Sequence, residues 1–189
     1  MGDRGGGVRM PIQIGAKPDS GFDDPIGMLK DCHRRIERFL GSLAYVAYTG
    51  QGASLSGEQA TAVESALRYF RESAPRHTAD EEESLFPRMR QQHGWALADL
   101  DVLESQHEEA DALHANVDVL FTQWLTEGTL GTQDEETLLS DLAHLQSIYT
   151  GHIQMEESII FPRASETLSA DDLRIVGEEF RRRRGVRSL

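Results

Sequence analysis

The chain has 189 residues, enough for one domain with a sizeable core, and its 39% of hydrophobic and 27% of charged residues are ordinary for a globular protein. Its net charge of −13 argues against nucleic acid and against an anionic membrane as partners. A single cysteine excludes an internal disulfide, and neither a membrane-spanning stretch nor a secretory signal is visible, so the sequence predicts a cytoplasmic protein.

Helical periodicity dominates the chain and predicts an all-α fold, an up-down-up-down four-helix bundle with a short additional C-terminal helix. We expect a flexible Gly-rich tail over residues 1–22, the bundle over residues 23–165, and the C-terminal helix with a basic tail over residues 166–189. The basic run from Arg181 to Arg184 is interpreted as a solvated helix end.

The ends of the first two long helices carry clear signals. The first helix is expected to begin with Asp24 as its N-cap and Pro25 in its first turn, and to stop at Gly50. The second is expected to begin at a capping box formed by Ser56 and Gln59.

The later elements follow in the same manner. Pro75 is expected to kink or break the second helix, and Pro87 to end it or bend it again. The third helix covers residues 97–124, the fourth covers residues 134–162, and a shorter fifth helix follows Ser169 as its N-cap.

Each of the four long helices carries one histidine on its apolar stripe: His33, His77, His107 and His152. The first two histidines are 44 residues apart and the last two are 45 apart. The sequence therefore indicates two helical hairpins that carry their histidines at equivalent positions. A metal-free bundle with satisfied core histidines is the alternative, but matched spacing on four helices favours metal ligands.

The second helix of each hairpin repeats one motif, His-x-x-x-Glu-Glu-x-x-x-Phe-Pro-Arg, which begins at His77 and again at His152. Residues four apart on a helix differ by about 40° in direction, so each of these histidines points the same way as Glu81 or Glu156. Buried carboxylates are costly unless they are paired or bound to metal, and no Lys or Arg lies at the right level on these stripes.

A pair of metal ions would remove this cost. Each ion would take two histidines, and the two glutamates would bridge the ions. Neutral imidazole and carboxylate without thiolate suit iron and, less selectively, manganese or zinc. The predicted ligands are His33, His77, Glu81, His107, His152 and Glu156.

Further polar residues are interpreted as lying around the ligands. Asp111 is expected to accept a hydrogen bond from an imidazole, with a role as seventh ligand as the alternative. His114 is an alternative to His107, and Glu37 is expected near the ligands without binding the metal. Tyr149 would hydrogen-bond to bound oxygen or simply fill the core.

The other residues that the two motif copies share are assigned to the surface and to packing. The second and third acids are interpreted as solvated groups, and the two Phe-Pro steps as packing and helix-end features. These acids are Glu82, Glu83 and Glu157.

These residues resemble the hemerythrin-like, or HHE cation-binding, domain. The resemblance covers about residues 24–162 and is carried by His33 and by the stretches HTADEEESLFP, LESQHEEAD and HIQMEESIIFP. It implies a four-helix bundle with a non-haem di-iron centre, in which the four histidines are terminal ligands. Glu81 and Glu156 would then be bridging carboxylates, with an oxo or hydroxo oxygen between the irons.

The chain departs from the oxygen-carrying hemerythrins at two places. They have a second histidine where this chain has Asp111, and an aspartate five residues after the fourth-helix histidine, where this chain has Glu156 after four. The pattern is closer to the branch with four histidines and two glutamates. That branch is similar to the di-iron part of proteins linked to repair of nitrosylated or oxidised iron–sulfur clusters.

Four kinds of function follow. The first is a di-iron protein that interacts with dioxygen, peroxide or nitric oxide in sensing, scavenging or iron-centre protection, with an unknown redox partner and at most an oxidase or peroxidase side activity. The second is a reversible oxygen carrier, which the missing fifth histidine disfavours. The third is a non-catalytic iron- or zinc-binding module. The fourth, a ferritin-like ferroxidase, requires Glu-x-x-His on two helices, and only Glu104 with His107 fits.

Overall fold

The computed structural model describes residues 19–92 and 97–187, and within these ranges every regular element is a helix. The predicted all-α class is therefore confirmed for this part of the chain, whereas most of the predicted tail, residues 1–18, lies outside it. The elements are α1 (Pro25–Thr49), α2 (Gly57–Glu72), α3 (Ala74–Asp80), the π-helical turn η1 (Glu81–Leu85), α4 (Phe86–Gln92), α5 (Leu97–Glu127), α6 (Thr132–Met155), the π-helical turn η2 (Glu156–Ile160), α7 (Phe161–Thr167) and α8 (Ala170–Arg183).

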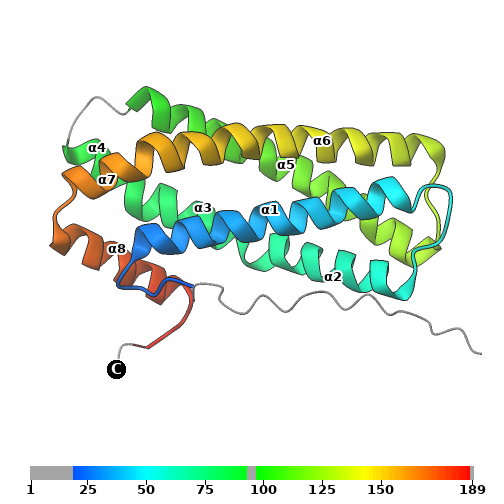
Figure 1. The fold of residues 1–189 in the computed structure, drawn as a ribbon, viewed down its shortest axis with the longest axis horizontal. Helices are drawn as coiled ribbons and strands as arrows, with labels where there is room; N and C mark the ends of the chain where they lie inside the picture. Colours follow the sequence, from blue (N-terminus) through cyan, green and yellow to red (C-terminus); the bar gives the residue numbers. More distant parts are fainter. Residues whose placement is uncertain (1–18, 93–96, 188–189) are drawn as a thin grey trace, which may run out of the picture.

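The long helices pack side by side as a helical bundle. α1 packs against α2 and α6, and α5 packs against the same two helices, so the four form a closed ring of neighbours. Figure 1 shows them running along the long axis of the molecule, with α4, α7 and α8 gathered at one end. Among the described residues, no helix combines the length and the apolar character needed to cross a membrane.

Local side-chain signals set the helix ends as predicted. Asp24 caps α1 by accepting a hydrogen bond at 2.9 Å from the backbone N–H three residues later. Ser56 and Gln59 form the expected capping box of α2. Ser169 caps α8, where Asp172 completes a second capping box.

The break predicted at Pro75 is present, because α2 ends at Glu72 and α3 begins at Ala74. Pro87 does not end the helical segment. The chain continues through it as α4, directly after the π-helical turn η1.

Both copies of the repeated motif contain a π-helical turn, which the apolar periodicity of the sequence does not predict. The backbone N–H of Phe86 donates to the carbonyl of Glu81, five residues earlier, and Phe161 donates to Glu156 in the same way. A proline follows each phenylalanine. Because proline lacks an N–H and its ring collides with the carbonyl four residues earlier, a wider turn accommodates it without breaking the helix.

Two apolar clusters fill the bundle on either side of the histidines. On α1, Leu29 belongs to one cluster and Leu40 to the other, with His33 between them. On α5, Leu103 and Ala110 belong to the two clusters in the same order and flank the histidine of that helix. The histidines therefore occupy a layer of the interior that is enclosed by hydrocarbon above and below.

The C-terminal helix α8 packs on the bundle against α1, α3 and η1. Gly177 allows a close approach, since a Cβ atom there would lie only 1.9 Å from the carbonyl oxygen of Phe22. The guanidinium of Arg181 lies over the ring of Phe22, 5.1 Å from its centroid. These contacts fix α8 against the segment that leads into α1.

The basic run at the end of α8 is only partly solvated. Arg183 and Arg184 both pair with the carboxylate of Asp80, which is fully buried. The interpretation of the whole run as a solvated helix end is therefore wrong for these two residues, because a buried carboxylate requires cationic partners. Arg182 has a side chain that is 71% exposed and matches the interpretation.

Candidate metal centre

Six buried side chains meet in the layer between the two apolar clusters. Their ligand atoms form two groups, and within each group the atoms lie within 4.8 Å of one another. One group is His33, His77, Glu81 and Glu156, and the other is Glu81, His107, His152 and Glu156. None of the six is more than 7% exposed. The structure thus brings together all six residues that the sequence predicts as ligands.

Each predicted hairpin supplies the histidines of one group. His33 on α1 and His77 on α3 come from the first hairpin, and their ring centroids are 5.1 Å apart. His107 on α5 and His152 on α6 come from the second, with centroids 4.6 Å apart. The two glutamates belong to both groups. The equivalent spacing of the two histidine pairs in the sequence therefore corresponds to two equivalent groups of ligand atoms that share both carboxylates.

The imidazole of His33 lies between two consecutive acids of the other hairpin. Its Nε2 is 3.0 Å from Oε2 of Glu156, and its Nδ1 is 2.9 Å from Oε1 of Glu157. Glu157 in turn accepts two hydrogen bonds, at 2.8 and 2.9 Å, from the guanidinium of Arg34. The ring also stacks on Phe161 at 5.5 Å, so both its position and its rotation are fixed.

His107 is held in the same way by acids of the first hairpin. Its Nε2 is 3.4 Å from Oε2 of Glu81, and its Nδ1 is 2.7 Å from Oε1 of Glu82. The interpretation of Glu82 and Glu157 as solvated acids is therefore wrong. In a π-helical turn, consecutive side chains diverge by a smaller angle than in an α-helix, so both acids reach one imidazole. Glu83, with a side chain 67% exposed, is solvated as predicted.

The remaining two histidines differ from each other. Nδ1 of His152 lies 3.0 Å from Oε1 of Gln106, and its Nε2 lies 3.3 Å from Glu156. Nε2 of His77 lies 3.5 Å from Oε1 of Glu81, whereas its Nδ1 is buried without a hydrogen-bond partner. The sequence does not indicate Gln106, because no periodicity marks a residue that acts across the bundle on another helix.

The donor set lacks the hydrogen bonds that a metal-free interior would require. Both oxygens of Glu81, both oxygens of Glu156 and Nε2 of His33 have no hydrogen-bond partner. Nε2 of His107 and Nε2 of His152 face each other at 3.1 Å. Because the Nδ1 atoms of three histidines face oxygen acceptors, the neutral form of each ring would carry its proton on Nδ1 and point its Nε2 lone pair inward, as a metal ligand requires. The arrangement therefore fits a pair of metal ions.

The pKa values of the two shared carboxylates are shifted in opposite directions. Burial, followed by the charge of Glu156, raises the pKa of Glu81 well above its ordinary value. Burial would raise the pKa of Glu156 as well, but hydrogen bonds and charge from His152 and His33, when these rings are protonated, outweigh it and lower that pKa. Burial also lowers the pKa of His77. In the metal-free protein the raised pKa of Glu81 favours its protonated form, and metal binding would displace that proton.

The four residues predicted around the ligands behave differently from one another. Nε2 of His114 and the hydroxyl of Tyr149 are 3.0 Å apart, on one side of the site. Asp111 is exposed and makes no hydrogen bond or ion pair within residues 19–92 and 97–187. The side chain of Glu37 is 56% exposed, and its carboxylate lies 3.9 Å from the guanidinium of Arg34. None of the four belongs to either group of ligand atoms.

Comparison with known proteins agrees with this geometry. The family described as hemerythrin HHE cation binding domain matches residues 24–164. The chain belongs to this hemerythrin family. It is also 31% identical over 166 residues to an uncharacterized protein of Haemophilus influenzae, a match that covers 88% of this chain and 93% of that protein. The hemerythrin match includes every one of the six clustered residues, and the metal-binding character of the family agrees with their donor set.

Proposed function

We propose that this hemerythrin-family chain is a cytoplasmic di-iron protein that interacts with dioxygen, peroxide or nitric oxide in a sensing, scavenging or iron-centre protection role. In this proposal the bundle has up-down-up-down topology and nucleic acid is not a partner. No electron-transfer partner is assigned. The ligands would be His33 and His77 for one iron, His107 and His152 for the other, and Glu81 and Glu156 as bridges.

A single observation carries the proposal: two carboxylates belong to both groups of ligand atoms, and all four of their oxygens are buried without hydrogen-bond partners. Buried carboxylates without hydrogen bonds are destabilising in a metal-free protein. Two cations placed between the histidine pairs would satisfy these oxygens together, which one cation could not do for both groups.

The donor chemistry favours iron over the alternatives. Each metal would receive two imidazole nitrogens and carboxylate oxygens, and no thiolate is present in either group. Such a ligand set leaves positions open, as non-haem iron proteins do when they bind small oxidants. An iron pair would supply one-electron and oxygen chemistry there. The protein would contribute ligand orientation through the Nδ1 contacts and exclusion of water through the two apolar clusters.

Metal content and an optical spectrum test the proposal. Protein purified aerobically from iron-replete cells is expected to contain two irons per chain and to absorb in the near ultraviolet through charge transfer. Substoichiometric metal, or a colourless zinc protein from such cells, would contradict the di-iron proposal and favour the non-catalytic metal-binding module.

The second experiment separates a redox or sensing role from oxygen carriage. The reduced protein is mixed with oxygen and its spectrum is followed in time. Fast, irreversible oxidation is expected for a redox or sensor centre. A stable spectrum that reverses under vacuum would instead identify an oxygen carrier, despite the absence of a fifth histidine.

A further inference from the structure

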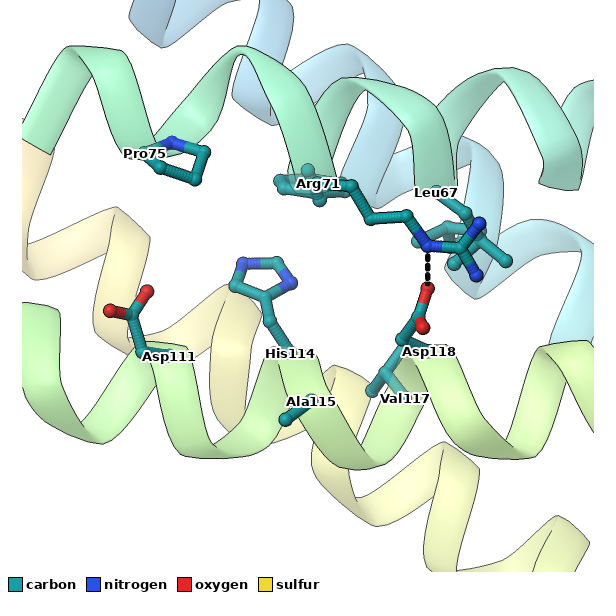
Figure 2. A pocket seen from close by; sticks show the side chains of 10 residues that line it. Leu67, Arg71, Pro75, Asp111, His114, Ala115, Val117 and Asp118 are labelled. Carbon is teal, nitrogen blue, oxygen red and sulfur yellow. Dashed lines mark hydrogen bonds and ion pairs between the residues drawn. The ribbon is translucent and has the colours of Figure 1, made fainter.

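A surface pocket of about 290 Å³ opens between the α2–α3 segment and α5. Figure 2 shows Pro75 and Arg71 on one side, facing Asp111, His114 and Asp118 on the other. Nε of Arg71 donates to Asp118 at 2.7 Å and closes one edge of the pocket. Arg71 and Asp118 thereby neutralise each other, whereas Asp111 has no cationic partner among the described residues.

A second, much smaller cavity of about 30 Å³ lies directly against the metal centre. Its walls include His77, His107 and His152, three of the six clustered residues, together with Tyr149. A cavity needs about 10–15 Å³ to hold one water molecule, so this one admits a ligand of about two to three heavy atoms.

The two spaces are neighbours. Phe70, Pro75, Asp111 and His114 line both of them. The ring of His114 stands at the boundary: it stacks on Phe70 with centroids 4.2 Å apart, and its Nε2 lies 3.0 Å from the hydroxyl of Tyr149. Rotation of this one ring would join the surface pocket to the inner cavity.

A competing path exists on the opposite side of the inner cavity. A pocket of about 300 Å³ between α1 and α6 is lined by Gly41, Gln146, Tyr149 and Thr150, among others. It shares only Tyr149 with the inner cavity, whereas the first pocket shares four residues with it. The geometry therefore favours the side of α5.

We propose that the pocket between α2–α3 and α5 is the route by which a small, neutral ligand reaches the metal centre. His114 is the gate of this route, because rotation of its ring would open the inner cavity. Asp111 is the charge filter of the route, because its carboxylate lies at the shared wall. The inference rests on the proposed function and adds to it the access route and the class of ligand. The inner cavity limits the ligand to about two or three heavy atoms, and the carboxylate of Asp111 at the shared wall repels anions.

Blocking each pocket in turn tests the route. In the reduced, iron-loaded protein, Ala115→Trp places a large ring in the pocket beside α5, and Thr150→Trp does the same in the competing pocket. Nitric oxide association, followed by stopped-flow absorbance, is expected to slow at least about fivefold in Ala115→Trp and to stay within about twofold in Thr150→Trp. The reverse order would overturn the proposed route. Equal iron content and equal thermal melting in both variants show that the site itself is intact.

The gate and the filter are tested separately. His114→Ala is expected to speed nitric oxide association at unchanged iron content. Asp111→Asn keeps the shape of the residue and removes its charge. It is expected to speed association of azide, an anion, by about fivefold at low salt, which corresponds to about 1 kcal/mol of repulsion in water, and to leave nitric oxide unchanged. An equal effect on both ligands, or none on azide, would overturn the role of Asp111.

A readout without iron separates failure of the route from failure of the proposed function. Crystals of the metal-free protein are exposed to xenon gas, which enters apolar cavities. Xenon density beside Phe70 and His114 supports the route, and density confined to the pocket beside Gly41 overturns it. Iron-loaded wild-type protein that binds no nitric oxide, together with xenon beside His114, would contradict only the proposed ligand chemistry.

Discussion

Arg184 donates a hydrogen bond at 2.5 Å to the buried carboxylate of Asp80, the residue that directly precedes Glu81. Arg183 pairs with the other oxygen of Asp80 and also donates to the hydroxyl of Ser84 at 3.1 Å. Two arginines at the C-terminal end of α8 therefore hold the residue before the π-helical turn and Ser84 within it, and this turn carries one predicted bridging ligand.

Replacing Arg184 by methionine is expected to lower the free energy of unfolding by about 3 kcal/mol, because Asp80 would remain buried with only one cationic partner. Urea unfolding of the metal-free protein measures this. Arg182→Met is the matched control: its side chain is 71% exposed, and a change of no more than about 0.5 kcal/mol is expected. Equal losses in the two variants would mean that the contact of Arg184 with Asp80 contributes nothing specific.

Glu81→Met is expected to change stability and metal binding in opposite directions. The carboxylate of Glu81 is buried without hydrogen-bond partners, so its removal should stabilise the metal-free protein by about 1–2 kcal/mol. The same variant should lose the second iron, since one shared ligand is missing. Chemical unfolding and iron analysis are the two measurements. Glu83→Met, at an exposed position, is expected to alter neither; a destabilised metal-free Glu81→Met would contradict the argument.

Glu82 and Glu157 are expected to tighten metal binding without touching the metal. Each orients an imidazole through Nδ1, at 2.7 Å for His107 and 2.9 Å for His33. Replacing either acid by alanine should weaken iron binding about ten- to hundredfold, as found for carboxylates that hydrogen-bond to ligating histidines. Competition with a chelator measures the affinity, and Glu83→Ala is the control. If all three variants bind iron equally, these acids have no orienting role.

The position of the site was predictable from the sequence because its geometry is set within single helices. His77 and Glu81 are one helical turn apart, so their proximity follows from helix geometry alone. Caps such as Asp24 and Ser56 were readable for the same reason, since a cap acts on its own first turn. The nearly equal sequence distances within the two histidine pairs then predicted that all four histidines lie at one level of the bundle.

Contacts that arise only from tertiary packing were not predictable. The π-helical turns leave no trace in apolar periodicity, yet they bring the second acid of each motif onto an imidazole. Gln106 meets His152 from another helix, and Asp80 meets Arg184 across 104 residues of chain. The two Phe-Pro steps are the one local signal that could have indicated the wide turns, because proline disfavours the regular turn before it.

A last prediction concerns pH and His114. Burial lowers the pKa of His114 to about 4. Between the unfolded value of about 6.5 and this folded value, the unfolded chain binds a proton that the folded chain does not, so stability is lost as pH falls through this window. The contribution of His114 to the loss is about 2 kcal/mol between pH 7.5 and pH 5.

His114→Gln isolates this contribution, because glutamine can still hydrogen-bond to Tyr149 but does not titrate. Urea unfolding of the metal-free protein at the two pH values should show a smaller acid loss in this variant than in the wild type. His144→Gln is the control, since the side chain of His144 is 52% exposed, and it should keep most of the wild-type loss. An unchanged loss in His114→Gln would mean that His114 takes up its proton in the folded protein as readily as in the unfolded chain, and the ring would then not be enclosed between Phe70 and Tyr149 in solution.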